Sequence, residues 1–351
     1  MNKILISLAL LVTLVACKKD HNTEIKNELN TEYLSAGPSS GDSWTLKGYS
    51  PSSISRRRGM SPFVIGNMAY TFGGLDVISG TRKKDCWQYN STTNTWTAVA
   101  GLPFDAVVRS DAASFVINGK GYIATGDYGG DFNQLDDLWE YNPANNKWKR
   151  KAEFPGGKRM MAQGFSINGK GYLVGGTLDV EFDGNILNPF CNDLYQYDPL
   201  NDTWTKMTNP PVSSKRAVFA FVCYSKAYVG FVSWSINTTN PERELWEYDP
   251  ATNGWLQKAN YPGYGTKDIF SYTNNYSGYV GAGYRPIPDD VSYSKEFWKY
   301  SPSNDTWTRL KDFPGYNRKG TIGFYVNSAG YAGLGVHPVY TTTNDLFRYN
   351  P

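Results

Sequence analysis

The stretch DLWEYNPANNKW, residues 137–148, decides the fold, because its pattern recurs along the chain. It begins with an acid, continues with aromatic residues at every second position, and closes with a tryptophan seven residues after the tyrosine. Alternation with a period of two is typical of a β-strand, and the Asn-Pro sequence in the middle favours a tight turn. The stretch therefore predicts two antiparallel strands joined by a hairpin, with aromatic side chains gathered on one face.

The closing tryptophan of this pattern recurs at intervals of 51 to 56 residues. The six tryptophans are Trp44, Trp96, Trp148, Trp204, Trp255 and Trp307. A second landmark, a tyrosine in an apolar hairpin, recurs at intervals of 50 to 56 residues, and its members are Tyr70, Tyr122, Tyr172, Tyr228, Tyr279 and Tyr331. Each repeat therefore contains two hairpins, or four strands, in about 50 residues, which is the size of one blade of a β-propeller.

The two ends of the chain each carry part of one repeat. The sequence DLFRYN at residues 345–350 reaches the strand with the tyrosine, and the tryptophan expected seven residues after Tyr349 would fall beyond Pro351. The sequence DSWTL at residues 42–46 supplies the matching outer strand. We therefore expect the N-terminal strand to complete the sixth blade, since this pairing closes the ring and covers sheet edges that would otherwise be exposed.

Paired glycines precede the spaced tyrosine and tryptophan in two of the repeats. The residues concerned are Gly73-Gly74, Tyr89, Trp96, Gly175-Gly176, Tyr197 and Trp204. This combination resembles the kelch repeat, and the resemblance extends over residues 43–351. It implies an all-β, six-bladed kelch-type β-propeller closed by an N-terminal strand that completes the last blade. Kelch propellers include sugar-processing enzymes, glycan-binding proteins and protein-interaction modules, so the resemblance leaves the function open.

The first 42 residues differ in composition from the repeats. Residues 1–16 combine a lysine with an apolar run that is typical of a signal peptide and too short to span a bilayer, which needs about 20 residues. The sequence LVAC at residues 14–17 resembles the lipobox of bacterial lipoproteins and implies a lipid on Cys17; a plain secretory signal with a chance cysteine is the alternative. Residues 17–42 are polar and predict a flexible tether.

These features predict a lipid-anchored propeller of residues 43–351 in the cell envelope. We expect it at the outer membrane, facing either the periplasm or the exterior, with the lipid anchor as its one contact with the membrane. We expect the propeller to be a monomer.

The charge, cysteine and histidine content excludes several classes of function. Lys and Arg total 35 and Asp and Glu total 32, and the net charge of +3 argues against a protein that binds nucleic acid. The three cysteines after Cys17 have no regular spacing and predict no disulfide framework. The two histidines, His21 and His337, cannot build a multi-histidine metal centre, which argues against a copper oxidase. We therefore expect no metal and no cofactor.

A basic residue recurs at the predicted entrance of the innermost strand of every blade. The candidate ligand-binding residues are Arg58, Arg109, Arg159, Arg216, Lys267 and Arg318, and a second basic residue stands beside three of them: Arg57, Lys215 and Lys319. Innermost strands line the central channel, so a ring of cations there would bind a carboxylate or a sulfate. The alternative is structural: the same side chains bind the acids that precede the aromatic residues, or loop carbonyls, within each blade.

The connections on the same side carry aromatic residues and acids, among them Asp127 and Trp234. Such residues are typical of sugar sites and of protein interfaces. We therefore expect the channel mouth to bind an acidic glycan or an envelope protein, and no motif identifies a catalytic residue. Sialic-acid mutarotases are similar in being exported kelch propellers, and in that alternative Asp127, Asp179 or Glu181 would supply the acid. A third hypothesis is a scaffold that contacts envelope proteins through its outer strands.

Overall fold

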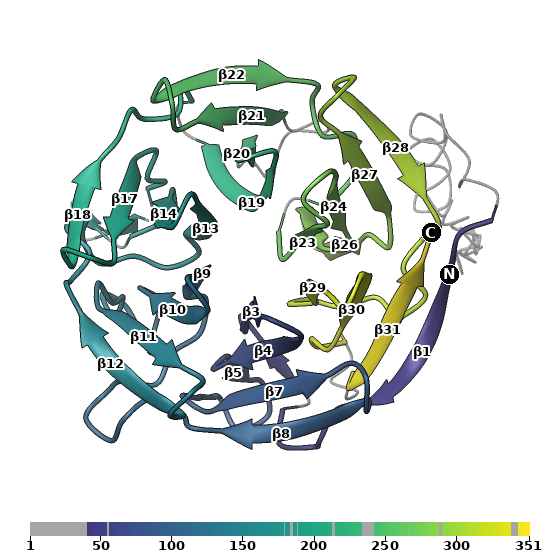
Figure 1. Cartoon of the computed structure of the whole chain (residues 1–351), viewed down its shortest axis with the longest axis horizontal. Coiled ribbons are helices and arrows are strands. Elements are labelled where there is room, and N and C mark those ends of the chain that lie inside the picture. The colour runs from purple at the N-terminus through teal and green to yellow at the C-terminus, as the bar shows by residue number, and fades with distance from the viewer. Residues whose placement is uncertain are drawn as a thin grey trace, which may run out of the picture. The chain divides into compact units, whose positions relative to one another are not determined.

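The computed structural model describes residues 41–54, 56–178, 180–182, 185–187, 189–212, 215–233, 242–265, 267–287, 290–337 and 343–351. Every regular element in these ranges is a β-strand. Residues 38–351 form one compact unit. In this unit six four-stranded sheets are arranged around a central axis (Figure 1). The predicted all-β propeller is confirmed, and the described residues include no helix long and apolar enough to cross a membrane.

The blades follow one another along the chain, and the first five are built from the innermost to the outermost strand. Blade one consists of β3 (Ser61–Ile65), β4 (Met68–Phe72), β7 (Cys86–Asn90) and β8 (Thr95–Val99). Blade two consists of β9 (Ala113–Ile117), β10 (Lys120–Ala124), β11 (Leu138–Asn142) and β12 (Lys147–Lys151). Blade three consists of β13 (Gln163–Ile167), β14 (Lys170–Val174), β17 (Leu194–Asp198) and β18 (Thr203–Lys206). Blade four consists of β19 (Lys215–Cys223), β20 (Lys226–Ser233), β21 (Arg243–Asp249) and β22 (Gly254–Lys258). Blade five consists of β23 (Phe270–Thr273), β24 (Gly278–Gly281), β27 (Phe297–Ser301) and β28 (Thr306–Leu310).

The sixth blade joins the two ends of the chain, as the sequence predicts. It consists of β29 (Ile322–Val326), β30 (Ala329–Gly333), β31 (Asp345–Asn350) and β1 (Ser43–Tyr49). Trp44 lies opposite Tyr349 in the antiparallel pair of β1 and β31. Asp42 adds two side-chain contacts, because its carboxylate accepts hydrogen bonds from the Tyr349 hydroxyl at 3.0 Å and the Lys311 backbone N–H at 2.7 Å. The first strand therefore closes the ring.

The recurring tryptophans join neighbouring blades. The indole N–H of Trp204 donates to the carbonyl of Ala152 in the preceding blade at 3.1 Å, and the Trp307 indole does the same to Ala259 at 2.9 Å. Trp44, Trp148 and Trp255 repeat this contact with the carbonyls of Lys311, Ala100 and Thr208. Each indole thus combines apolar packing with a satisfied donor, which explains why the spacing of the tryptophans reveals the blade boundaries.

The glycine doublet of the kelch pattern marks a backbone conformation that other residues also adopt here. Gly73 and Gly175, the first glycines of two doublets, have φ of 65° and 69°. Thr125, Ala282 and Leu334 occupy the same position in blades two, five and six, with φ of 61°, 55° and 57°. The left-handed turn therefore persists where the glycine is lost, at some cost in strain for residues that carry a side chain.

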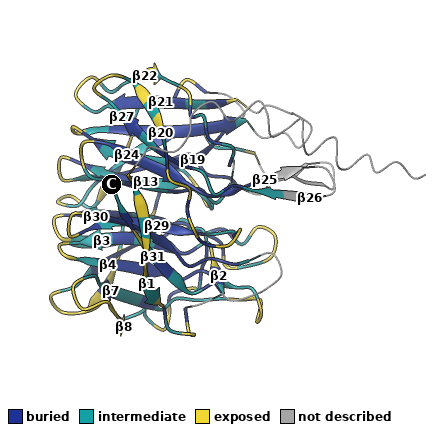
Figure 2. Cartoon of the chain, turned by 90° about the vertical axis from the view of Figure 1, so that its right-hand side faces the viewer, coloured by how far each residue is buried: buried dark blue, intermediate teal, exposed yellow. Residues whose placement is uncertain are grey.

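The innermost strands of the six blades line the central channel (Figure 1). They begin on one side of the ring, here called the mouth, and end in hairpin turns on the other, here called the turn side. Three small sheets lie in the connections: β2 (Arg57–Arg58) with β5 (Leu75–Asp76) and β6 (Thr81–Arg82), β15 (Val180–Phe182) with β16 (Asn185–Leu187), and β25 (Tyr284–Ile287) with β26 (Asp290–Tyr293). In Figure 2, β2 and β25 lie on the mouth side and the C-terminus on the turn side.

Candidate functional site

Four buried arginines that precede innermost strands form ion pairs within their own blades. Arg109 is 0% exposed, and its two terminal nitrogens bind the carboxylate oxygens of Asp137 at 2.5 and 2.8 Å. The same guanidinium donates to the carbonyl of Thr125 at 3.1 Å, in the left-handed turn described above. The arrangement repeats in the pairs Arg57–Asp85, Arg159–Asp193 and Arg318–Asp345. Each pair fastens the third strand of a blade to the entrance of its innermost strand.

These ion pairs account for three residues of the predicted basic ring. Burial alone would raise the pKa of Asp137, but the hydrogen bonds and the charge of Arg109 hold it below the usual value of an aspartate. Arg109, Arg159 and Arg318 are thus buried and neutralised inside their blades. The expectation that all six cations ring the mouth does not hold for these three, since each binds the acid of its own blade.

In four blades the next position at the strand entrance carries a cation, and successive residues of an extended strand face opposite sides. Arg216 lines the channel and is 6% exposed. Lys267 and Lys319 place their ammonium groups over the ring of Tyr284, 5.9 and 4.7 Å from its centre. Burial, and then the charge of Arg216, lower the pKa of Lys267 to about 8, and Lys319 and the exposed Arg58 act in the same direction. Arg58, Arg216, Lys267 and Lys319 form the cationic cluster.

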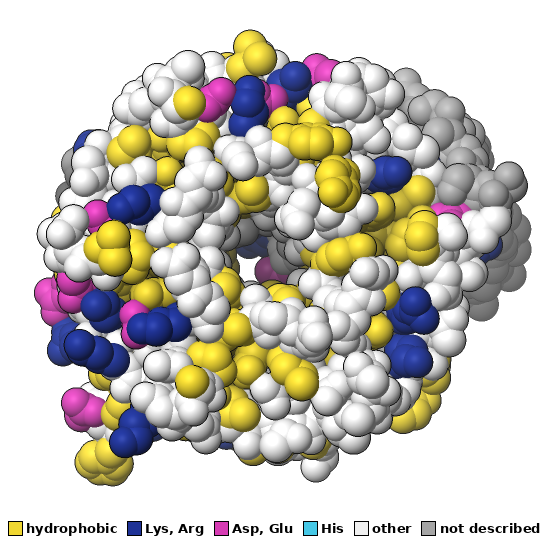
Figure 3. Space-filling view, viewed as in Figure 1, with side chains coloured by type: hydrophobic (Ala, Val, Ile, Leu, Met, Phe, Trp, Pro, Cys, Tyr) yellow, Lys and Arg dark blue, Asp and Glu magenta, His cyan; other side chains and the backbone are white. Residues whose placement is uncertain are grey.

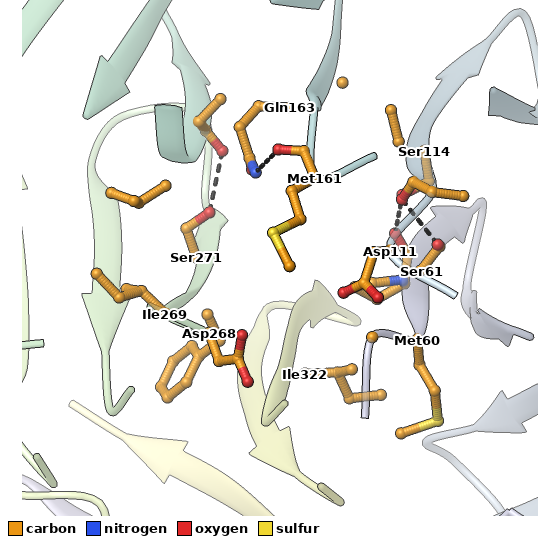
Figure 4. A pocket seen from close by; sticks show the side chains of 18 of the residues that line it. Met60, Ser61, Asp111, Ser114, Met161, Gln163, Asp268, Ile269, Ser271 and Ile322 are labelled. Carbon is orange, nitrogen blue, oxygen red and sulfur yellow. Dashed lines mark hydrogen bonds between the residues drawn. The ribbon is translucent and has the colours of Figure 1, made fainter. Parts of the chain in front are cut away.

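Two acids lie beside the cationic cluster: Asp111 stands two residues after Arg109, and Asp268 directly follows Lys267. Figure 4 shows the side chains of Asp111 and Asp268 pointing into the channel from different blades. Burial, and then the negative charge of Asp268, raise the pKa of Asp111 above the usual value of an aspartate. A carboxyl group with a raised pKa beside a second carboxyl group and several cations is a common arrangement for proton transfer.

The backbone around the mouth holds Asp111 in a left-handed conformation with φ of 57°. Its N–H donates to the carbonyl of Gly59 at 2.8 Å, and its own carbonyl accepts from the N–H of Met161 at 2.8 Å, so three blades are linked. A Cβ atom on Gly59 would lie 2.6 Å from the Oδ1 atom of Asp111, and the glycine therefore leaves room for the carboxyl group. Left-handed residues other than glycine are concentrated at functional sites.

Below the charged groups the channel forms a cavity of about 260 Å³. Its wall mixes apolar side chains such as Ile269 and Ile322 with the hydroxyl groups of Ser61 and Ser114 (Figure 4). Ser61 donates to the carbonyl of Ala112 at 2.8 Å, which ties blade one to blade two. The mouth is thus an amphiphilic pocket of small-molecule size with its charge at one end.

Asp127, a predicted site residue, is buried at the mouth and bound by a cation. Its carboxylate forms an ion pair with Arg82 of β6 and accepts a hydrogen bond from the N–H of Gly129 at 2.9 Å. Its negative charge acts on Asp111, which places the two acids near each other. Asp127 therefore forms part of the rim, and the positive charge of Arg82 balances its negative charge.

Three of the predicted residues, Cys17, Asp179 and Trp234, and the side chain of Glu181 lie outside the described residues. His337 lies at the rim, with its ring 5.7 Å from that of Tyr316. The described residues contain no group of three or more His, Cys, Asp or Glu side chains able to hold a metal ion. The sequence reasoning missed Asp111 and Asp268, although both stand one or two residues after a basic position, where the register of the repeat could have located them.

Comparison with known proteins agrees with this architecture. Residues 56–103 and 160–211 match the Kelch motif. The chain is 31% identical over 179 residues to an N-acetylneuraminate epimerase of Pasteurella multocida, covering 50% of this chain and 40% of that protein. It is 25% identical over 230 residues to an N-acetylneuraminate epimerase of Escherichia coli K12, covering 65% of this chain and 54% of that protein. The chain thus spans about half the length of these relatives.

Among solved structures the chain is similar to YjhT, with a TM-score of 0.66 and 17% identity. The match covers 83% of this chain and 94% of that one. At this level of identity the similarity concerns the fold. The chain is a β-propeller whose first and third blades carry the Kelch motif.

Proposed function

We propose that the mouth of the channel binds a small carboxylated sugar of the N-acetylneuraminate class and interconverts its two anomers. The observation that carries the proposal is the placement of two acids, Asp111 and Asp268, beside a cluster of four cations at the end of the channel cavity. The names of the relatives from Pasteurella multocida and Escherichia coli support the same substrate class.

The cationic cluster supplies the recognition of the substrate carboxylate. Arg216 presents a guanidinium at the channel wall, and guanidinium groups bind carboxylates with two parallel hydrogen bonds. Each charge-assisted hydrogen bond contributes roughly 1.5–3 kcal/mol. Arg58 and Lys319 act on the same group of charges and add to the attraction. Because the carboxylate of such a sugar is attached to its anomeric carbon, binding it also brings the reacting atoms to the two acids.

Interconversion of the anomers needs one proton acceptor and one proton donor. The acceptor takes the proton of the anomeric hydroxyl, the donor protonates the ring oxygen, and the bond between the ring oxygen and the anomeric carbon breaks to give an open-chain ketone. Closure on the other face reverses both transfers, so no proton is gained or lost. Asp111, with its raised pKa, suits the donor, and Asp268 suits the acceptor.

The proposal is tested by following the anomers of N-acetylneuraminate by proton NMR. The α-anomer is released from an α-glycoside by a sialidase, and its decay to the β-anomer is timed with and without the protein. We expect the wild-type protein to accelerate the decay and Asp111→Asn to lose about 10²–10⁴-fold of that acceleration. Glu153 is an exposed acid that follows β12, the outermost strand of blade two, so Glu153→Gln serves as the matched control and should keep the wild-type rate.

Two results would count against the enzymatic part of the proposal. Acceleration that survives both Asp111→Asn and Asp268→Asn would show that other residues transfer the protons. Saturable binding without acceleration would show that the mouth is a binding site for an acidic glycan or for an envelope protein. In that second case, if Arg216→Met abolished binding without changing the melting temperature of the protein, the ligand would still be assigned to the mouth.

We further propose that the protein acts in the cell envelope as a lipid-anchored monomer. The apolar run and the LVAC sequence at residues 14–17 support this proposal. Growth with a radiolabelled fatty acid should label the wild-type chain and leave Cys17→Ser unlabelled. A processed chain without lipid would support a plain secretory signal instead.

A further inference from the structure

We propose a second sugar-binding site, specific for a neutral pyranose, at the opposite end of the channel. It lies on the turn side, where hairpin turns of blades three, four and five line an open cavity of about 300 Å³. The residues that carry the argument are Ser166, Asn168, Tyr224, Ser225, Asn275 and Tyr276. This site is independent of the cationic cluster at the mouth.

Two exposed tyrosine rings form the apolar part of this site. Tyr224 and Tyr276 are 57% and 65% exposed, whereas most of the other described tyrosines are buried; Tyr49, Tyr128 and Tyr316 are exposed as well. Their ring centres are 5.8 Å apart and their planes meet at 64°. An exposed aromatic face beside a cavity offers the surface on which the C–H face of a pyranose stacks. The two rings meet edge to face beside the cavity.

The backbone of Tyr224 adopts a conformation that is unfavourable for a residue with a large side chain. Tyr224 and Ser225 have φ of 52° and 58°, as a two-residue turn with two left-handed positions requires. The first position of the same turn is asparagine in three other blades, at Asn118, Asn168 and Asn327, with φ of 49°, 51° and 47°. Asparagine tolerates this conformation and a bulky aromatic residue is an outlier in it. The turn itself gives no reason for the tyrosine, which points to a use for the ring.

The turn of blade five places the second ring beside the first. Four residues separate β23 from β24, against two between β19 and β20. The N–H of Tyr224 donates to the carbonyl of Asn275 at 3.2 Å, and the N–H of Tyr276 donates to the side chain of Asn274 at 3.0 Å. The first hydrogen bond connects the two turns, and the second stabilises the turn of blade five, so together they help to fix the relative position of the two rings.

The remaining groups around the cavity match the hydroxyl groups of a neutral sugar. None of the residues that line it carries a charge. The hydroxyl oxygen of Ser166 is buried and has no hydrogen-bond partner among the described residues. The amides of Asn168 and Asn275 can donate and accept. In Figure 3, which views the turn side, the rim of the central hole is uncharged, and charged atoms lie at the outer edge and deep in the hole. An acidic ligand would find no cationic partner among the residues that line this cavity.

Saturation-transfer NMR with three neutral disaccharides, cellobiose, lactose and N,N′-diacetylchitobiose, tests the site on the full chain. We expect transfer to the C–H protons of at least one of them in the wild-type protein. Tyr276→Ala and Tyr224→Asn should each reduce the signal at least tenfold, and Tyr276→Phe should keep it. Tyr224→Asn installs the residue found in the other turns, so its melting temperature should equal or exceed that of the wild type.

Arg216→Met provides the control for the other end of the channel and should leave this signal unchanged. The proposal is overturned if none of the three sugars receives saturation, or if transfer survives both Tyr224→Asn and Tyr276→Ala. Loss of the signal in Arg216→Met would also overturn it, since the sugar would then occupy the mouth.

Discussion

Adjacent residues at the entrance of the innermost strands have opposite roles. In blade one Arg57 is buried in an ion pair with Asp85, whereas Arg58 is exposed at the mouth. In blade four the ammonium group of Lys215 binds Glu244, and Arg216 lines the channel. The cause is the alternation of an extended chain, which sends one side chain into the blade and the next toward the axis. Of two adjacent positions at the strand entrance, one therefore stabilises the blade and the other contributes a cation to the candidate site.

The buried ion pairs should stabilise the fold and leave recognition to the cationic cluster. Arg109→Met leaves the carboxylate of Asp137 buried without its cation, and we expect the free energy of unfolding to fall by about 3–5 kcal/mol. Arg150→Met, which breaks the exposed pair with Glu153, should cost about 1 kcal/mol or less. Urea denaturation of both variants checks the difference. Equal costs would contradict a structural role for the buried pairs.

The mouth should lose affinity for carboxylates in alkaline solution. The pKa of Lys267 is lowered from 10.5 to about 8, so the side chain is charged at pH 7 and becomes neutral as the pH rises through that value. A carboxylate binds the charged form, and its dissociation constant should therefore increase above about pH 8. Lys267→Gln should bind more weakly at pH 7 and show no such step between pH 7 and 9. Calorimetric titrations across this range measure both effects. A step of the same size in the variant would assign the titration to another group.

At the scale of single elements, the short turn before each innermost strand sets the geometry of the site. Gly59 and Gly66 both have positive φ, at 64° and 56°. A Cβ atom on Gly59 would meet the Asp111 carboxyl group, whereas a Cβ atom on Gly66 would meet nothing within 4 Å. The two glycines thus share a left-handed backbone conformation and differ in their neighbours, which makes them a matched pair.

Gly59→Ala should therefore disturb the site, and Gly66→Ala should not. Both substitutions put a side chain in the left-handed region and should cost about 1–2 kcal/mol of stability. Gly59→Ala must also displace the Asp111 carboxyl group, so we expect slower exchange of the anomers in this variant alone. The NMR assay and thermal melts of the two variants test this. Equal activity in both would show that the position of Asp111 is not critical.

At the scale of the whole molecule, the ring depends on one strand from the far end of the sequence. Trp44 on β1 packs against Phe297 and Phe313 of the neighbouring blade, at 5.0 and 5.6 Å between ring centres. Its indole N–H binds the carbonyl of Lys311 at 3.0 Å. A contact that joins the first strand to the fifth blade stabilises the closed ring as a unit.

Trp44→Ala should open this closure. We expect a loss of about 3 kcal/mol in the free energy of unfolding, because the substitution removes a large packed ring and its hydrogen bond. Leu46→Ala on the same strand should stay within about 0.5 kcal/mol, since Leu46 is 44% exposed. Chemical denaturation of the two variants gives the comparison. A loss of only about 0.5 kcal/mol in both variants would show that the Trp44 side chain does not hold the ring closed.

The repeats made the fold predictable, whereas the site depends on details within one repeat. The spacing of Trp44 to Trp307 and the incomplete last repeat predicted the blades and the closing strand, because packing between blades demands the same residue in each. The sequence could not show whether Arg109 faces the channel or the interior of its blade, since a strand shifted by one residue exchanges its two sides. Asp111 and Asp268 stand at the same position of the repeat in blades two and five, but the acid is not repeated in every blade, so the pattern did not single it out. Their approach to each other across the channel is seen in the closed ring (Figure 4).

The most direct test of the account is a calorimetric comparison of N-acetylneuraminate with its methyl ester at pH 7. The two ligands differ in the charge of one carboxyl group, which is the group that the cationic cluster should recognise. We predict that the wild-type protein binds the acid at least about tenfold more tightly than the ester, and that Arg216→Met removes most of this difference. Equal affinities for acid and ester in the wild-type protein would contradict carboxylate recognition at the mouth.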